Sequence, residues 1–389
     1  MTFTLIFSLT LLAGVLTSEL ARRSILSTAV VFLAAGFIVG NSVLGAFAFN
    51  PEDQLVVWLT VFTLFSVLFT DGMRAGIADL KASWPLVWRA LGIGLPLTMA
   101  GTAALAHWIA GLPWLESWLL GAILSPTDPV LVSAIVGQKQ VPKRIRDLLN
   151  VESGLNDGLT LPVILVLLGE TQHQAVKVGI PLEQALLGIA LGVAAAWATI
   201  RLEESRIFGA TEAYRPLLGV SIGLIVLSSS FLLGVNAFLA AFAAGITVSS
   251  VSPAVHESFN QFGELLTELL KLAALLAFGS LISFSELSRL PGTAYLFMAL
   301  ALVAVRPASL AVALAGSGLP WLEWVTAAWF GPKGFSSATY ALWVVTSSAS
   351  RKLEIYHLAG LVIIASIVAH SSTDVIVARW FCEEEEREG

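Results

Sequence analysis

Long apolar segments follow one another along almost the whole chain, and polar residues are confined to short stretches between them. A helix that spans a bilayer needs roughly 17–25 mostly apolar residues. Windows of this kind fall near residues 3–20, 25–47, 54–72, 86–110, 114–137, 148–169, 181–201, 216–233, 236–251, 264–286, 292–316, 322–347 and 356–380. The pattern predicts an all-α polytopic membrane protein with about 13 transmembrane helices.

The region from 216 to 251 fits two interpretations. Gly234-Val-Asn236 is a very short connection, so one long bent helix fits the region as well as two helices do. Gly and Ala residues scattered through the seventh and ninth windows suit close helix packing.

Two windows contain sequences that interrupt a helix. The fifth carries Ser125-Pro-Thr-Asp-Pro129, where the prolines remove backbone donors and disfavour helical geometry before them. The twelfth carries Gly331-Pro-Lys-Gly334. We expect both segments to unwind within the membrane.

The interrupted windows occupy matching places in the chain. With the first and last six helices taken as halves and the seventh as a linker, each interruption falls in the fifth helix of its half. An odd linker inverts the second half, as in secondary transporters with ion sites near the midplane. We therefore predict one transmembrane domain over 1–380, with a first inverted repeat at 1–170, a linker helix at 171–210, a second repeat at 211–380, and an acidic cytoplasmic tail at 381–389.

Composition agrees with a membrane protein. Hydrophobic residues make up 57% of the chain and charged residues only 12%, against roughly 25% charged residues in soluble domains. The net charge of −6 comes partly from the acidic tail, which we expect to be solvated, so neither a nucleic-acid nor a protein partner is predicted. The single cysteine, Cys382, permits no intrachain disulfide.

Basic residues predict the orientation. Lys and Arg concentrate in loops that follow odd-numbered helices, which places the amino terminus outside and the carboxyl terminus in the cytoplasm, most simply in a prokaryotic inner membrane. Asp71 is expected to be solvated in one such loop, beside Arg74. Lys271, Arg306 and Lys333 fall inside apolar windows and need partners.

Two carboxylates stand where hydrocarbon is expected. Asp128 lies in the fifth window and Asp157 at the mouth of the sixth. An ionised carboxylate at that depth costs at least about 2.5–3.5 kcal/mol, so such residues face a water-filled cavity or bind a cation. In the sixth window, Ser153 and Asp157 are one helical turn apart, as are Glu152 and Asn156 on the adjacent face.

The candidate ligands are all oxygen atoms. Free carbonyls of an unwound Thr127-Asp128 segment, with oxygens from Ser153, Asp157 and water, suit a hard monovalent cation. The histidines show no metal-ligand spacing, which argues against a transition metal. No enzyme motif is present, and paired interrupted helices favour a carrier over a channel.

These motifs resemble those of the monovalent cation:proton antiporter-1 family, the NhaP-type and eukaryotic sodium/proton exchangers. The resemblance covers nearly the whole chain, through Leu68-Phe-Thr-Asp-Gly-Met-Arg74, Ser125-Pro-Thr-Asp-Pro-Val130, Glu152-Ser-Gly-Leu-Asn-Asp157, Phe238-Leu-Ala-Ala-Phe-Ala-Ala-Gly245, Arg306-Pro307 and Gly331-Pro-Lys-Gly334.

The resemblance implies roles for the site residues. It implies that Asp157 binds either a cation or a proton and that Asp128, Ser153 and the Thr127 carbonyl complete the site. It also implies support from an Asn156 tie to the unwound stretch at Thr127 and from a Glu152–Arg306 pair.

Lys333 departs from the family pattern, which commonly has Gly-x-Arg-Gly. We expect the ammonium to offset helix-end dipoles and nearby carboxylates. Participation of Lys333 in proton traffic is the alternative.

The implied activity is secondary active exchange by alternating access in a homodimer, without a cofactor, which would serve pH homeostasis. Sodium, or lithium, against a proton is the first expectation; potassium/proton exchange is the alternative, and a cation channel is less favoured. Asn156 stands where electrogenic relatives have a second aspartate, so the resemblance favours electroneutral turnover.

Overall fold

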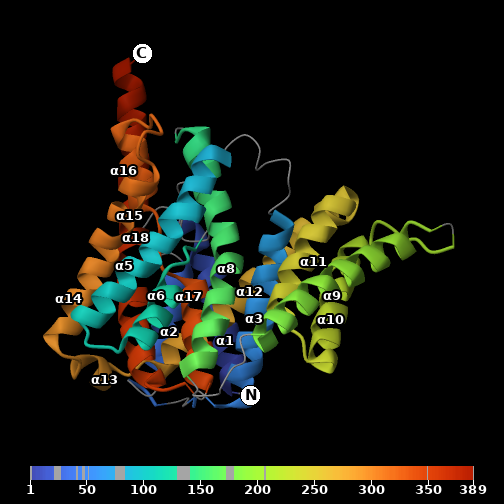
Figure 1. Ribbon diagram of the computed structural model, residues 1–389, viewed down its shortest axis with the longest axis horizontal. Helices are drawn as coiled ribbons and strands as arrows, with labels where there is room; N and C mark the ends of the chain where they lie inside the picture. The colour runs from blue at the N-terminus through green and yellow to red at the C-terminus, as the bar shows by residue number, and fades with distance from the viewer. Residues whose placement is uncertain are drawn as a thin grey trace. The chain divides into compact units, whose positions relative to one another are not determined.

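The computed structural model describes residues 2–21, 28–40, 43–45, 49–50, 52–74, 84–128, 141–171, 179–205, 207–347 and 349–388. Helices are the only regular structure in these residues (Figure 1). Up to residue 203 they are α1 (Thr2–Ala21), α2 (Thr28–Val39), α3 (Gln54–Arg74), η1 (Ala90–Gly94), α5 (Leu95–Trp108), α6 (Trp114–Leu124), α8 (Lys143–Thr171) and α9 (Gly179–Glu203). The later ones are α10 (Arg215–Leu233), α11 (Ala237–Val251), α12 (Pro253–Leu281), α13 (Phe284–Ser288), α14 (Gly292–Leu300), η2 (Ala301–Val305), α15 (Arg306–Ala313), α16 (Trp321–Trp329), α17 (Phe335–Thr346) and α18 (Lys352–Glu388).

The all-α prediction is confirmed for the described residues, and each predicted window contains helix. Within them, seven helices are long and apolar enough to cross a membrane, or eight if α11 and the start of α12, bent by 117°, form one span. Helices α6, α16 and α17 are shorter because they end or begin at an interruption. The part of the fifth window from 129 to 137 lies outside the described residues.

The region from 216 to 251 forms two helices. Gly234 ends α10 in the left-handed conformation, with φ of 65°, as is common for a glycine just past a helix end. The Asn236 side chain then caps α11 by accepting hydrogen bonds from the N–H groups of Phe238 and Leu239. The three-residue connection therefore ends α10 at Gly234 and caps the start of α11 at Asn236.

Helix α12 begins at Pro253, well before the predicted start near 264. The added turns mix polar residues with buried Val255 and Phe259. Because only one face of these turns is apolar, they fall outside a continuous apolar window, and the predicted start of the helix is too late.

The chain forms two compact units. Unit 1 comprises Met1–Thr60, Ser83–Asn156 and Leu272–Gly389, and unit 2 comprises Val61–Ala82 and Asp157–Lys271. Helices α3, α8 and α12 each contribute residues to both units.

In unit 2, α9 and α10 pack against α11, and the three run side by side in Figure 1. The helices approach closely at glycines. A Cβ atom on Gly192 of α9 would collide with the backbone carbonyl of Ala240 in α11, and one on Gly188 would collide with that of Asn236. Small residues thus permit the close packing expected of membrane helices.

In unit 1, α5 packs against α6, and η1 packs against α15. The π-helical turns η1 and η2 interrupt the fourth and eleventh windows, and Arg306 directly follows η2. Single π-helical turns occur frequently at functional sites.

A repeated hexapeptide opens both interrupted windows. Gly-Leu-Pro-Trp-Leu-Glu occurs at 111–116 and again at 318–323. The first glycines, Gly111 and Gly318, have φ values of 77° and 70°, and the glutamates Glu116 and Glu323 are both buried. This internal repeat is a signal that hydropathy windows do not detect.

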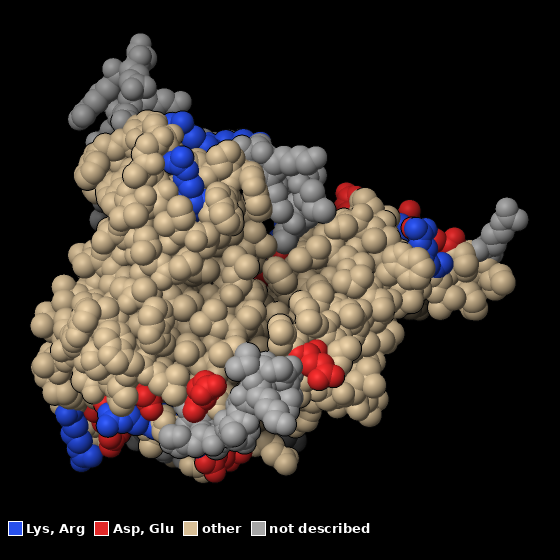
Figure 2. Space-filling model, viewed as in Figure 1, with Lys and Arg blue, Asp and Glu red and all other residues tan. Residues whose placement is uncertain are grey.

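Charged side chains gather near the ends of helices in each unit, and uncharged residues cover the helix sides (Figure 2). Large apolar side chains face outward on several helices, including Leu5, Leu186, Leu224, Leu232 and Val303. Such outward-facing apolar residues are expected where helices contact lipid.

Candidate functional site

The two predicted interruptions are present and meet within unit 1. Residues 126–128 and 330–334 are not helical, and the N–H of Asp128 donates a hydrogen bond to the carbonyl of Pro332 at 3.0 Å. The proline and glycine signals therefore mark real breaks, one after α6 and one between α16 and α17.

Asp128 caps the helix that follows the second break. Its carboxylate accepts a hydrogen bond from the N–H of Phe335, the first residue of α17, at 2.6 Å, and the residue is 3% exposed. The amino end of a helix carries unsatisfied N–H groups and positive potential, so a buried carboxylate is stabilised there.

Lys333 makes the reciprocal contact from the second break. Its ammonium donates to the carbonyls of Ser125 at 3.2 Å and Pro126 at 3.5 Å, directly after α6. The carboxyl end of a helix leaves carbonyls unsatisfied and carries negative potential, so a cation stabilises it. The partner that Lys333 needs is thus a helix end.

Three polar side chains join α8 to the first break. The hydroxyls of Thr127 and Ser153 lie 2.9 Å apart, and Asn156 Nδ2 donates to Thr127 Oγ1 at 2.7 Å. All three residues are buried, and Asn156 Oδ1 accepts no hydrogen bond from the described residues. The contact uses the Thr127 hydroxyl and leaves the Thr127 carbonyl to other partners.

Arg306 and Glu152 form a buried two-point ion pair. The guanidinium donates to the two carboxylate oxygens at 2.7 and 3.0 Å and also to the carbonyl of Ala327, near the end of α16, at 3.2 Å. A Cβ atom on Gly331 would collide with this guanidinium, so the break needs a glycine here. The pair links α8, α15 and α16 inside unit 1.

Asp157 follows Asn156 on α8, where the helix passes from unit 1 into unit 2. The residue is fully buried. Helical spacing puts Asp157 on the same face of α8 as Ser153, one turn further along. The structure thus brings together the predicted site residues of unit 1: Thr127, Asp128, Glu152, Ser153, Asn156, Arg306 and Lys333. Asp157 follows Asn156 directly on α8.

Two groups of polar residues differ from the sequence interpretation. Asp71 is buried inside α3 and lies 3.5 Å from Arg74 Nη1, while Arg74 also donates to Glu264 at 3.0 Å. The prediction of a solvated Asp71 is therefore wrong, because Asp71 lies within α3 and its side chain is buried beside Arg74. His370 and Ser366 contact the two ends of the second break, and neither is among the site residues that the sequence predicts.

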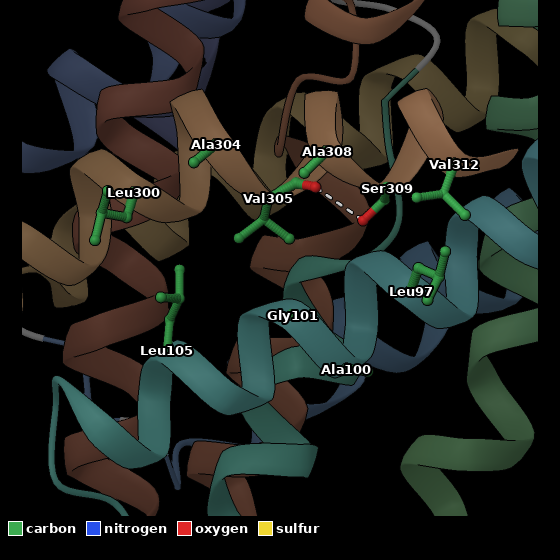
Figure 3. Close-up of a pocket in the computed structure, with 10 residues that line it drawn as sticks. All are labelled: Leu97, Ala100, Gly101, Leu105, Leu300, Ala304, Val305, Ala308, Ser309 and Val312. Atoms are coloured by element: carbon green, nitrogen blue, oxygen red, sulfur yellow. Dashed lines mark hydrogen bonds between the residues drawn. The ribbon is translucent and has the colours of Figure 1, made fainter. Parts of the chain in front are cut away.

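A groove on unit 1 is lined almost entirely by apolar side chains and so offers no charged ligands for a cation. It lies between α5 and the η2–α15 segment, has a volume of about 560 Å³, and is lined by apolar residues and Ser309 (Figure 3). The Ser309 hydroxyl donates to the Val305 carbonyl at 2.8 Å. No ionisable side chain lines the groove among the described residues, which leaves the buried cluster as the candidate site.

Comparison with known proteins gives a consistent result. The family model described as "Sodium/hydrogen exchanger, transmembrane" matches residues 7–379. The K(+)/H(+) antiporter NhaP2 of Shewanella oneidensis is 26% identical over 97% of the chain and 66% of the relative. The K(+)/H(+) antiporter NhaP of Alkalimonas amylolytica is 26% identical over 96% of the chain and 65% of the relative. The chain thus spans about two thirds of the length of these relatives.

The fold also matches a solved structure. The sodium proton antiporter MjNhaP1 of Methanocaldococcus jannaschii superposes with a TM-score of 0.80, at 20% identity, over 97% of this chain and 98% of that one. This likeness supports the all-helical fold and, at such low identity, no more than the fold.

Proposed function

Because this chain belongs to the sodium/hydrogen exchanger family of integral membrane antiporters, we propose that it exchanges a monovalent cation for a proton, with Asp157 as the group that binds either ion. Sodium, or lithium, is the first candidate. Potassium is the second, because the two curated relatives named above are K(+)/H(+) antiporters.

The burial of Asp157 in a helix that can cross a membrane supports this proposal. Asp157 is fully buried in α8, which is long and apolar enough to span a bilayer. An ionised carboxylate is costly at such depth, and a bound cation or a bound proton offsets its charge. An acid in this position is therefore a candidate ion-binding group.

The proposed cation ligands are the carboxylates of Asp157 and Asp128, the Ser153 hydroxyl and the Thr127 carbonyl, together with water. The contact between the Thr127 and Ser153 hydroxyls holds the first break against α8 at these two residues. Asp128 contributes its carboxylate from the first break, where it also caps α17. Oxygen ligands around an incompletely dehydrated site suit alkali cations.

Competition for one carboxylate makes the cycle an exchange. If a cation and a proton cannot occupy Asp157 together, each change of access carries one positive charge in one direction. Because Asn156 stands in place of a second acid, one cation is exchanged for one proton and turnover is electroneutral. Lys333 supports the site through its contact with the end of α6, and Asn156 supports it through its hydrogen bond to the Thr127 hydroxyl.

Two further features support inverted repeats within a thirteen-span fold. The Gly-Leu-Pro-Trp-Leu-Glu hexapeptide opens the fifth window of each half. The π-helical turns η1 and η2 likewise fall in the fourth window of each half. Repeats of this kind place ion sites where interrupted helices cross.

The test is ion exchange in proteoliposomes that contain a pH-sensitive dye. We expect added sodium, lithium or potassium to dissipate an imposed proton gradient with the wild-type protein, at a rate that a clamped membrane potential does not change. Asp157→Asn should abolish exchange, while Glu170→Gln, which alters an exposed carboxylate on the same helix, should not. Full exchange in Asp157→Asn would refute the assignment of Asp157.

A further inference from the structure

One face of α18 contacts both ends of the second break. Ser366, His370 and Thr373 follow one another at spacings of four and three, so they lie along a single side of the helix. Each of them hydrogen bonds to Trp329 or to Lys333, the residues on either side of Phe330-Gly331-Pro332.

Ser366 holds the far end of the break. Its hydroxyl oxygen accepts a hydrogen bond from the backbone N–H of Lys333 at 2.6 Å, and the contact is buried. In a continuous helix this N–H would bond to a carbonyl in the preceding turn. Here the preceding turn is unwound, so a side chain from α18 takes the place of that carbonyl.

His370 and Thr373 hold the near end. The Nε2 atom of His370 lies 3.0 Å from the Trp329 carbonyl, which is the last one in α16. The Trp329 indole N–H donates to Thr373 Oγ1 at 2.8 Å, and its ring stacks on the imidazole with centroids 5.0 Å apart. Trp329 is therefore attached to α18 by its backbone and by its side chain.

The imidazole also contacts Ser366, which closes the chain of hydrogen bonds. Nδ1 of His370 lies 2.8 Å from the Ser366 carbonyl and 3.2 Å from its hydroxyl. A neutral ring protonated on Nε2 donates to Trp329 and accepts from the Ser366 hydroxyl; a doubly protonated ring donates to both carbonyls. The bond to Trp329 is available in both states, so it does not require a change of protonation.

We propose that His370 is a positioning residue for transport. Together with Ser366, it fixes the two ends of the Phe330–Gly334 segment on α18 and so sets where the Lys333 ammonium and the Pro332 carbonyl meet Ser125 and Asp128. The inference rests on the proposed function only for its effect on transport; the attachment itself is a separate structural statement.

The consequence of losing the attachment is a misplaced cation site. The Lys333 contact to α6 and the Asp128 contact to α17 both depend on the course of this short segment. Removal of one buried hydrogen bond of this type is worth about one factor of ten in an equilibrium. We therefore expect the effect in the apparent KM for the cation more than in the maximal rate.

The experiment compares His370→Ala, His370→Gln and Ser366→Ala with Val368→Ala, a matched control that truncates an exposed side chain on the same helix. His370→Ala and Ser366→Ala should raise the apparent KM about tenfold. His370→Gln should stay close to wild type, with an unchanged pH profile, because its amide can donate to Trp329 but does not titrate. Val368→Ala should leave KM unchanged.

Hydrogen exchange of the purified protein, measured by mass spectrometry, tests the attachment without transport. Peptides that contain the Lys333 amide should exchange faster in Ser366→Ala and His370→Ala than in wild type or Val368→Ala. Unchanged exchange together with a wild-type KM in both variants would overturn the proposal. A shifted pH profile in His370→Gln would also overturn it, because the residue would then act by titrating. If His370→Ala does not fold, Ser366→Ala and His370→Gln decide the outcome.

These results separate the two proposals. A wild-type protein that exchanges none of the three alkali cations refutes the proposed function, and hydrogen exchange still decides the attachment. Wild-type exchange with no effect of Ser366→Ala and His370→Ala refutes the role of His370 alone.

Discussion

The carboxylate of Asp128 accepts the backbone N–H of Phe335 at 2.6 Å, so a side chain from the first break caps the helix that follows the second. Lys333 makes the reverse contact, from the second break to the carbonyls of Ser125 and Pro126 after α6. Asp128 of the first break thus stabilises the start of α17, and Lys333 of the second break stabilises the end of α6. These two contacts hold the interrupted segments together.

This relationship predicts different effects for two substitutions of Asp128. Asp128→Asn keeps an oxygen that can accept the Phe335 N–H, so we expect it to fold and to lose cation affinity with the charge. Asp128→Ala also removes the cap, which is worth about 1 kcal/mol and more in a buried setting. Thermal unfolding in detergent and the apparent KM for sodium measure the two effects. Equal melting temperatures for the two variants would contradict the capping role.

The sequence predicts the breaks well because their signals are local. Proline before and after Asp128, and Gly331-Pro-Lys-Gly334 in the twelfth window, each prevent regular helix irrespective of the surroundings. The charges of Asp128 and Lys333 then indicate that these breaks belong to a functional site, because a charged side chain within the membrane needs a partner.

Partners on other helices are harder to predict. His370 lies in an apolar window and shows no metal-ligand spacing with the other histidines. Its partners include backbone carbonyls of α16 and α18, which the sequence does not indicate. The Lys333 contact is of the same kind. The burial of Asp71 beside Arg74 is likewise a contact that hydropathy does not indicate.

The Glu152–Arg306 pair predicts a large loss of stability for single substitutions. Arg306→Met leaves a buried carboxylate without its guanidinium, and Glu152→Met leaves the converse; either loss costs about 3–5 kcal/mol in buried pairs. The double variant Glu152→Met/Arg306→Met removes both charges and should recover much of that loss. Thermal unfolding of the three variants tests this coupling, and additive losses in the double variant would exclude it.

Gly331 predicts a steric effect next to the same pair. A Cβ atom there would collide with the Arg306 guanidinium, whereas one on Gly154 of α8 would meet nothing within 4 Å. Gly331→Ala should therefore lower the melting temperature and displace Arg306, while Gly154→Ala should stabilise α8 by up to about 1 kcal/mol through helix propensity. The matched pair is compared by thermal unfolding. A neutral Gly331→Ala would mean that the break moves freely to accommodate a methyl group.

Two substitutions of Lys333 distinguish a role as a fixed positive charge from a role in proton transfer. Lys333→Arg keeps a permanent cation with several donors for the carbonyls after α6, so exchange should persist within about threefold of wild type and the pH profile should keep its shape. Lys333→Met removes the charge and leaves those carbonyls unsatisfied, and exchange should fall at least about tenfold. Initial rates across pH measure both. A changed pH profile in Lys333→Arg would instead place the lysine in proton traffic.

Competition at Asp157 predicts how pH acts on cation affinity. When one proton and one cation exclude each other from a single carboxylate, each lowers the apparent affinity for the other by the same factor. On the acidic side, the apparent KM for sodium should rise by up to about tenfold per pH unit, while the maximal rate at saturating sodium changes little. Initial rates over a grid of sodium concentrations and pH values measure this relation, with Glu170→Gln as a control that should follow the wild type. An apparent KM that does not change with pH, while the maximal rate falls, would mean that the proton binds at a group other than the cation carboxylate. The exchange would then require two sites instead of one.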